Sequence, residues 1–135
     1  MIFRLIYQSR NLLRRPNGSS ELLKIIRSAE RNNLALALTG ALLFDKDRFI
    51  QVLEGESAKV TTLFIRISQD PRHRDISLID ARAAEERRFP NWSMALIEGP
   101  PTYRENSSSD HLLNLMCSQL AESSGSIEVS IPIWS

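Results

Sequence analysis

The sequence has one cysteine, Cys117, among 135 residues, so no disulfide can form within the chain. A lone thiol is typical of proteins from a reducing compartment. The chain also lacks any apolar run near the roughly 18 residues that a membrane span needs. Its opening, MIFRLIY, is interrupted by Arg4 and is too short for a signal peptide. These absences favour a cytoplasmic protein.

An excess of charge is missing as well. Lys and Arg number 17 and Asp and Glu number 16, which gives a formal net charge of +1. Such a chain has no global field that would attract nucleic acid or a lipid surface. Paired aromatic residues on exposed strands, which an RNA-binding sheet uses, are not found either. We therefore expect neither a nucleic-acid partner nor a membrane, and a single globular domain without internal repeats.

The hydrophobic pattern alternates between the periods of strands and helices. Strands are expected at residues 2–9, 34–44, 48–55, 76–83 and 91–98, with a hairpin turn at 45–48 and a bulge at Gly40. Helices are expected at 21–32 and from a capping Ser57 to a stop before Pro71. The order β-α-β-β-α-β-β predicts an α/β ferredoxin-like two-layer sandwich. It would have a mixed five-stranded sheet with both helices on one face.

The last part of the chain has a different texture. Residues 107–122 combine a serine-rich start with apolar residues at helical spacing, so a third helix is expected on the other face of the sheet. The tail at 127–135 alternates, but Pro132 restricts it to an edge strand or an irregular end. We expect residues 1–98 to form the main domain and 99–135 a helical extension.

Polar residues interrupt the apolar stripes at Tyr7, Asn33, Gln51 and the pair Arg66–Asp70. Each has an ordinary explanation: a core tyrosine with its hydroxyl at the rim, a helix C-cap, an exposed strand position and a surface ion pair. In the predicted sandwich, however, all of them face the space between the helices and the sheet. A planar ligand with an amide-like edge, such as a flavin, would satisfy them together. The faces of that ligand would pack on aliphatic residues, namely Ile25, Ile26, Leu53 and Ile67.

Six segments of the chain also resemble one known family. They are RLIYQS, AERNN, LTGALLF, FIQVLEG, IRISQDPRH and RRFPNWSMAL, and they cover residues 1 to about 98. In this order and spacing they are similar to the BLUF family, sensors of blue light using FAD. The resemblance implies a photoreceptor that binds FAD non-covalently.

The resemblance also implies roles for individual residues. Tyr7 would donate an electron to the excited flavin, and Gln51, whose carboxamide has both a donor and an acceptor, would rearrange its hydrogen bonds. Trp92 and Met94 would relay that change. The expected cofactor-binding positions are Ile25, Asn32, Asn33, Phe49, Gln51, Leu53, Arg66, Ile67, Asp70, Arg72 and His73.

For the output, the resemblance to short members implies no catalytic domain, and hence a signal to a separate effector protein. A surface near the C-terminal end would serve self-association, an effector or both. We expect an interaction surface formed by Leu112, Leu115, Met116 and residues 127–134. Two other classes remain open. One is an acylphosphatase-like hydrolase, for which RRPNGSS is a poor phosphate cradle, and the other is a light-independent interaction module. His111 and Cys117 are too few to suggest a metal site.

Overall fold

A computed structural model describes residues 1–11, 18–44, 47–71, 73–91, 94–98, 108–122 and 130–131. The elements, in chain order, are β1 (Ile2–Asn11), α1 (Gly18–Ala35), β2 (Thr39–Phe44), β3 (Arg48–Gly55), α2 (Ser57–Ser68), β4 (His73–Ala84), β5 (Met94–Glu98), α3 (Ser109–Glu122) and β6 (Ser130–Ile131). The predicted order of strands and helices is confirmed. Elements β1, α1 and β4 extend beyond their predicted bounds, and β3 has the bounds predicted. Strands β2 and β5 are shorter than predicted, since Leu34 and Ala35 belong to the end of α1 and β5 begins only at Met94.

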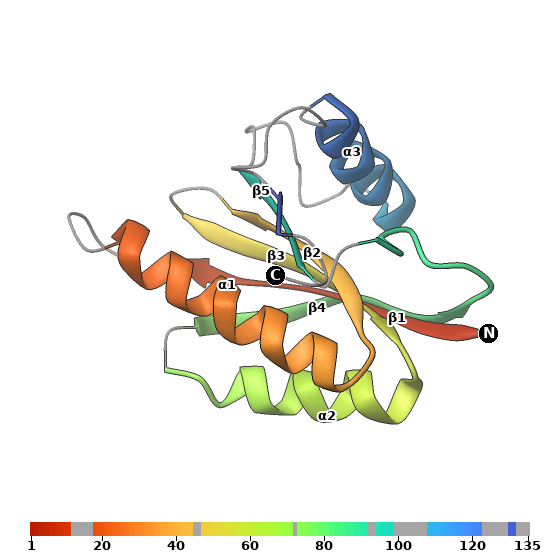
Figure 1. Ribbon diagram of the computed structural model, residues 1–135, viewed down its shortest axis with the longest axis horizontal. Helices are drawn as coiled ribbons and strands as arrows, with labels where there is room; N and C mark the ends of the chain where they lie inside the picture. The colour runs from red at the N-terminus through yellow and green to blue at the C-terminus, as the bar shows by residue number, and fades with distance from the viewer. Residues whose placement is uncertain are drawn as a thin grey trace.

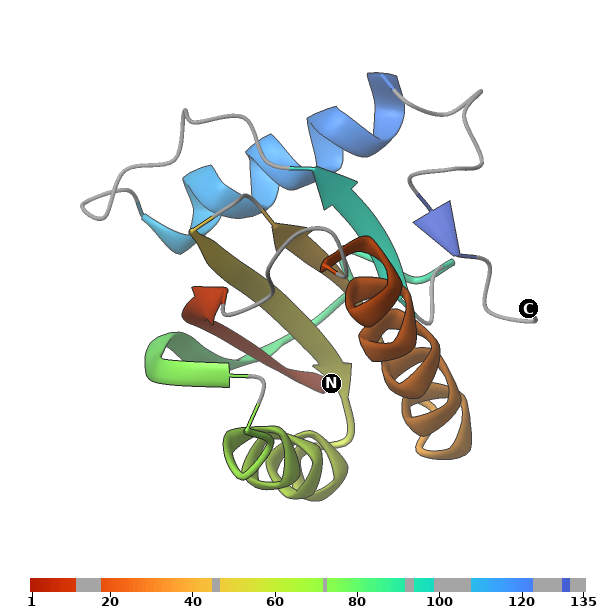
Figure 2. The same ribbon diagram turned by 90° about the vertical axis from the view of Figure 1, so that its left-hand side faces the viewer.

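The strands form one mixed sheet in the order β4-β1-β3-β2-β5-β6. Only β2 and β5 pair in parallel, and the other neighbours are antiparallel. Helices α1 and α2 cover one face of the sheet, while α3 lies across the other (Figures 1 and 2). This is the predicted ferredoxin-like sandwich, with a third layer added by α3. The two-residue β6 is an edge strand, as its position before Pro132 requires.

The sheet separates two cores, because successive side chains of a strand point to opposite faces. On the α1/α2 face, Leu5 and Tyr7 of β1 pack with Leu53 of β3. On the α3 face, Ile6 packs with Val52, and α3 contributes a set of buried residues, Leu112, Leu113 and Met116. The expectation that Leu112 and Met116 belong to an exposed interaction surface is therefore wrong, since both are fully buried.

Two local predictions were also wrong. The β2–β3 pairing runs through Gly40 without a bulge, since Thr39, Gly40 and Ala41 face consecutive residues of β3. Glycine is needed there for another reason: a Cβ atom at position 40 would lie 1.9 Å from the Val52 carbonyl oxygen. Helix α2 does begin at Ser57, but its N-cap residue is Glu56, which makes no side-chain capping hydrogen bond.

The helices are moderate in length and amphipathic. Among the residues that the structure describes, no helix is long and apolar enough to cross a membrane. The described part of the chain likewise contains no group of three or more His, Cys, Asp or Glu side chains that could hold a metal ion.

Candidate functional site

Tyr7 and Gln51 meet in the middle of the sheet. They are directly opposite each other in the antiparallel β1–β3 pair, and both side chains point to the α1/α2 face. The Tyr7 hydroxyl donates a hydrogen bond to Gln51 Oε1. Both residues are buried, with 0% of Tyr7 and 4% of Gln51 exposed to solvent. The carboxamide that interrupts the apolar stripe of β3 is therefore a buried group with a partner, and the interpretation of Gln51 as an exposed position is wrong.

Met94 completes this cluster from a third strand. Gln51 Nε2 donates to Met94 Sδ at 3.7 Å, and Met94 is fully buried at the start of β5. A thioether sulfur is a weak acceptor. The carboxamide is thus held firmly on its oxygen side by a phenol and only loosely on its nitrogen side. The sheet brings together Tyr7, Gln51 and Met94 from β1, β3 and β5.

The Tyr7 phenol is packed against α2. Its ring centroid lies 5.3 Å from that of Phe64, with the two planes inclined at 56°. Burial raises the pKa of Tyr7 well above its ordinary value, and the negative charge of Asp70 raises it further. The phenol is therefore held protonated, as a hydrogen-bond donor to Gln51. The contact of Phe64 with Tyr7 was not predicted from the sequence, because Phe64 belongs to an ordinary apolar helical stripe.

Asn33 is the buried polar residue that α1 contributes to this face of the sheet. It lies within the helix, two residues before its end, and is fully buried. The alternative explanation of Asn33 as a C-cap is wrong, because the residue with positive φ after the helix is Ala37, at 54°. Asn32, the preceding residue, is half-buried. A buried carboxamide on α1 thus covers the same sheet face as Gln51.

The remaining predicted positions fall into three groups. Phe49 and Leu53 are fully buried in the core that contains Tyr7, and Ile67 is half-buried at its edge. Asp70 is half-buried, whereas Arg66 is exposed, so Arg66 is not drawn into this core. Outside the described residues or side chains lie Ile25, Arg72, His73 and Trp92.

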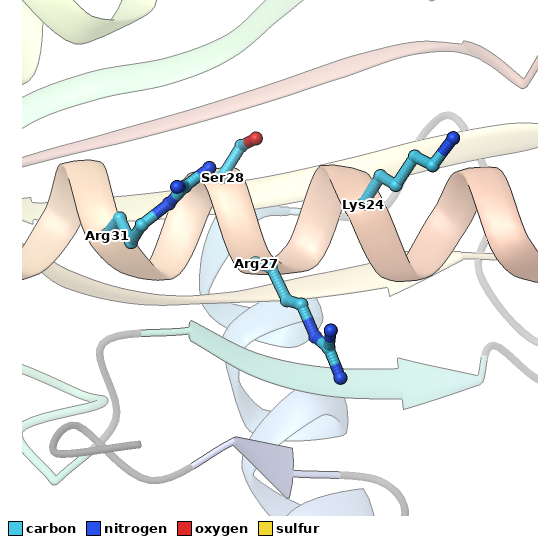
Figure 3. Close-up of a pocket in the computed structure, with 4 residues that line it drawn as sticks. All are labelled: Lys24, Arg27, Ser28 and Arg31. Carbon is cyan, nitrogen blue, oxygen red and sulfur yellow. The ribbon is translucent and has the colours of Figure 1, made fainter.

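A hollow of about 500 Å³ lies along α1 and was not predicted from the sequence. It is lined by three cationic side chains and one hydroxyl, from Lys24, Arg27, Ser28 and Arg31. Figure 3 shows Lys24, Ser28 and Arg31 extending from one side of the helix, while Arg27 points toward β5. Lys24, Ser28 and Arg31 lie at i, i+4 and i+7, and Arg27 lies at i+3. This helical spacing is the signal that could have revealed the row. Such a lining favours an anionic group.

This set of groups suits a planar heteroaromatic ring with an anionic tail. Carboxamides such as Asn33 and Gln51 complement a ring edge that carries both carbonyl and N–H groups. Apolar neighbours such as Leu53 and Ile67 suit the faces of the ring. The cationic hollow on the same helix suits phosphate. The chemistry of the residues present is thus compatible with a flavin nucleotide.

Comparisons with known proteins agree with this geometry. A family model described as "Sensors of blue-light using FAD" matches residues 2–95. The photoactivated adenylate cyclase subunit beta of Euglena longa is 34% identical over an alignment of 125 residues, and the match covers 87% of this chain and 13% of that protein. The blue light- and temperature-regulated antirepressor BluF of Escherichia coli is 34% identical over 98 residues, 73% of this chain and 24% of that protein.

Among solved structures, the dark state of BlrB, described as a BLUF protein, superposes with a TM-score of 0.76 at 31% identity. That match covers 90% of this chain and 96% of the other. The chain thus spans a small part of the two named relatives and nearly all of the solved domain.

Proposed function

Because this chain belongs to the BLUF family, whose members sense blue light using FAD, we propose that Tyr7, Gln51 and Met94 form its photochemical switch. The single observation that carries the proposal is the buried hydrogen bond from the Tyr7 hydroxyl to Gln51 Oε1. The BLUF domain is a sensor rather than an enzyme, and its cofactor is FAD. The relatives give no support to the two other classes, an acylphosphatase-like hydrolase and a light-independent interaction module.

Tyr7 and Gln51 have different roles in this mechanism. When bound, the flavin supplies the absorption of blue light and an acceptor for an electron and a proton. Tyr7 is the donor of both, and its raised pKa keeps the proton on the phenol until the electron leaves. The proton departs from the oxygen that already faces Gln51, so the carboxamide lies on its route.

The orientation of the Gln51 carboxamide is what stays changed after light absorption. Its Nε2 group donates to Met94 Sδ, which is a weak acceptor, so a reorientation that breaks this contact gives up little there. Once Tyr7 has recovered its electron and proton, a rearranged carboxamide presents different donors and acceptors to its neighbours. Met94 would be the first residue of β5 whose contact changes, because its Sδ atom accepts from Gln51 Nε2.

We assign the other cofactor contacts as follows. Asn32 and Asn33 would serve the ring edge, and Ile25, Phe49, Leu53 and Ile67 would contact the ring. Arg66 and Asp70 would contact the flavin from α2 and just after it, respectively, and Arg72 and His73 would lie near its ribityl or phosphate end. The phosphates would occupy the hollow on α1. Nine residues separate Asn33 from Lys24, which is about 13.5 Å at ~1.5 Å per residue. Holding the ring edge at Asn33 and the phosphates at Lys24 would require a flavin nucleotide extended along α1.

The test is an absorption spectrum of the purified, FAD-loaded chain before and after blue light. We expect a reversible red shift in the wild type and none in Tyr7→Phe or Gln51→Leu. Gln119→Leu is the matched control, since Gln119 lies on α3, across the sheet. A red shift that survives in Gln51→Leu would contradict the mechanism, and a chain that does not bind FAD would contradict the function.

For the output, we propose a separate effector protein and self-association in the cytoplasm. The relatives named above are a cyclase subunit and an antirepressor, so the domain serves different outputs in different proteins. Residues 1–98 would form the flavin-binding domain, and 99–135 would receive its signal. Trp92 would relay the signal together with Met94.

A further inference from the structure

Glu54 is a buried carboxylate that the proposed photochemistry does not use. It lies three residues after Gln51 on β3, points to the α3 face and is 0% exposed. Arg4 Nε donates to its Oε2 atom at 2.7 Å. Backbone amides complete its shell: the Arg88 N–H lies 3.0 and 2.9 Å from the two carboxylate oxygens, and the Phe89 N–H lies 2.9 Å from Oε1. A charge buried so completely is tolerated only with such partners.

Those two amides belong to the segment that connects β4 to β5. Arg87, in the same segment, also binds β3, since its Nη1 atom donates to the Glu54 carbonyl at 3.2 Å and to Thr39 Oγ1 at 2.9 Å. The Arg4 Nη2 atom donates to the Glu86 carbonyl at 2.8 Å. The backbone of the β4–β5 segment is thus fixed to the end of β3 by charge-assisted hydrogen bonds.

The side chains of the same segment hold α3. Phe89 is 1% exposed and packs in the α3-face core, which contains Leu112 and Met116. Arg88 Nη2 donates to Asn114 Oδ1 at 2.8 Å and lies 3.7 Å from Cys117 Sγ. Residues 88 and 89 therefore bind Glu54 through their backbone and α3 through their side chains.

We propose that Glu54 is a positioning residue that couples β3, and therefore Gln51, to α3 through the β4–β5 segment. A displacement of β3 moves the carboxylate, which moves the backbone of Arg88 and Phe89, which moves the helix they hold. Five residues after Phe89 the same segment enters β5 at Met94, which contacts the Gln51 carboxamide. A change at Gln51 can therefore reach the β4–β5 segment through β3, which carries Gln51, and through β5. The proposal rests on the proposed function, because it assumes that Gln51 rearranges in light.

The experiment compares hydrogen–deuterium exchange of residues 109–122 in light and in the dark, using the FAD-loaded full chain. We expect a light-dependent difference in the wild type. Glu54→Gln should lose this difference while its flavin keeps the full red shift. Glu56→Gln, at an exposed neighbouring carboxylate, is the matched control and should behave as the wild type. Where Glu54→Gln does not fold, Arg88→Gln removes the Asn114 contact without touching the amides that bind Glu54, and the same loss is expected.

Each other outcome overturns the coupling. A difference that persists in Glu54→Gln shows that α3 responds by another route. Loss of the red shift together with the difference shows that Glu54 supports the flavin site itself. A wild type that shifts its spectrum without any change in α3 refutes the coupling but leaves the proposed function intact, whereas a wild type with no red shift refutes the proposed function.

Discussion

Replacing Tyr7 by phenylalanine removes one oxygen atom from a fully buried position, while the ring can still pack against Phe64. Gln51 Oε1 then loses its phenol donor in a site where little water can replace it. Leaving a buried polar group without its partner costs about 1–3 kcal/mol. Gln51→Leu removes the group that accepts the hydrogen bond of the Tyr7 hydroxyl and should lower the free energy of unfolding by a similar amount.

The double variant Tyr7→Phe/Gln51→Leu removes both polar groups together. Replacing both partners of a buried hydrogen bond by apolar groups can be nearly neutral. The double variant should therefore be less destabilised than the sum of the single variants, by at least about 1 kcal/mol.

Urea unfolding of the four proteins, with and without FAD, measures this coupling energy. Tyr7→Phe combined with Gln119→Leu is the control cycle and should be additive within about 0.5 kcal/mol, as expected for distant sites. If the Tyr7–Gln51 cycle is equally additive, the two side chains do not depend on each other, and the switch proposed from their contact is refuted.

Three further predictions concern other parts of the molecule. Because the pKa of Tyr7 is raised in the folded chain, the unfolded chain releases this proton first; stability should fall by about 1.4 kcal/mol per pH unit as the pH rises above ~10, and Tyr7→Phe should remove that part of the slope in thermal unfolding. Gly40→Ala should destabilise the fold by about 3 kcal/mol or more, because the new methyl group meets the Val52 carbonyl; an unchanged urea midpoint would disprove the close approach. Lys24→Gln and Arg31→Gln should each raise the Kd for FAD about two- to fivefold by fluorescence titration, because both side chains are exposed and their charges are screened, and should leave riboflavin binding unchanged. Equal losses for riboflavin would show that the hollow does not hold the phosphates.

The alternation of side chains made much of this site predictable from the sequence. A strand period of two places Phe49, Gln51 and Leu53 on one face whatever the partner strands are, so the unusual glutamine was visible at once. The family segments then supplied the assignment of Tyr7 and Met94. Helix ends were less accurate, since Glu56 and not Ser57 is the N-cap of α2.

Contacts between distant segments were not predictable in this way. Glu54 accepts hydrogen bonds from backbone amides 34 and 35 residues away, and no side-chain pattern marks a backbone donor. The close approach at Gly40 depends equally on the neighbouring strand. Leu112 and Met116 were taken as a free surface because a single helix does not reveal which of its faces the sheet covers.

Strands β1 and β3 supply alternate residues to two different cores, which bears on how faithfully the chain folds. A slip of β3 by one residue would exchange its two sets of side chains between the two cores. Gln51 would then lie under α3 among aliphatic side chains, and Ile50 would replace it beside Tyr7. Such a misfolded chain would bury the Gln51 carboxamide without its hydrogen bond to Tyr7, which is energetically unfavourable. The residue proposed to respond to light would therefore also disfavour incorrect strand pairing while the protein folds.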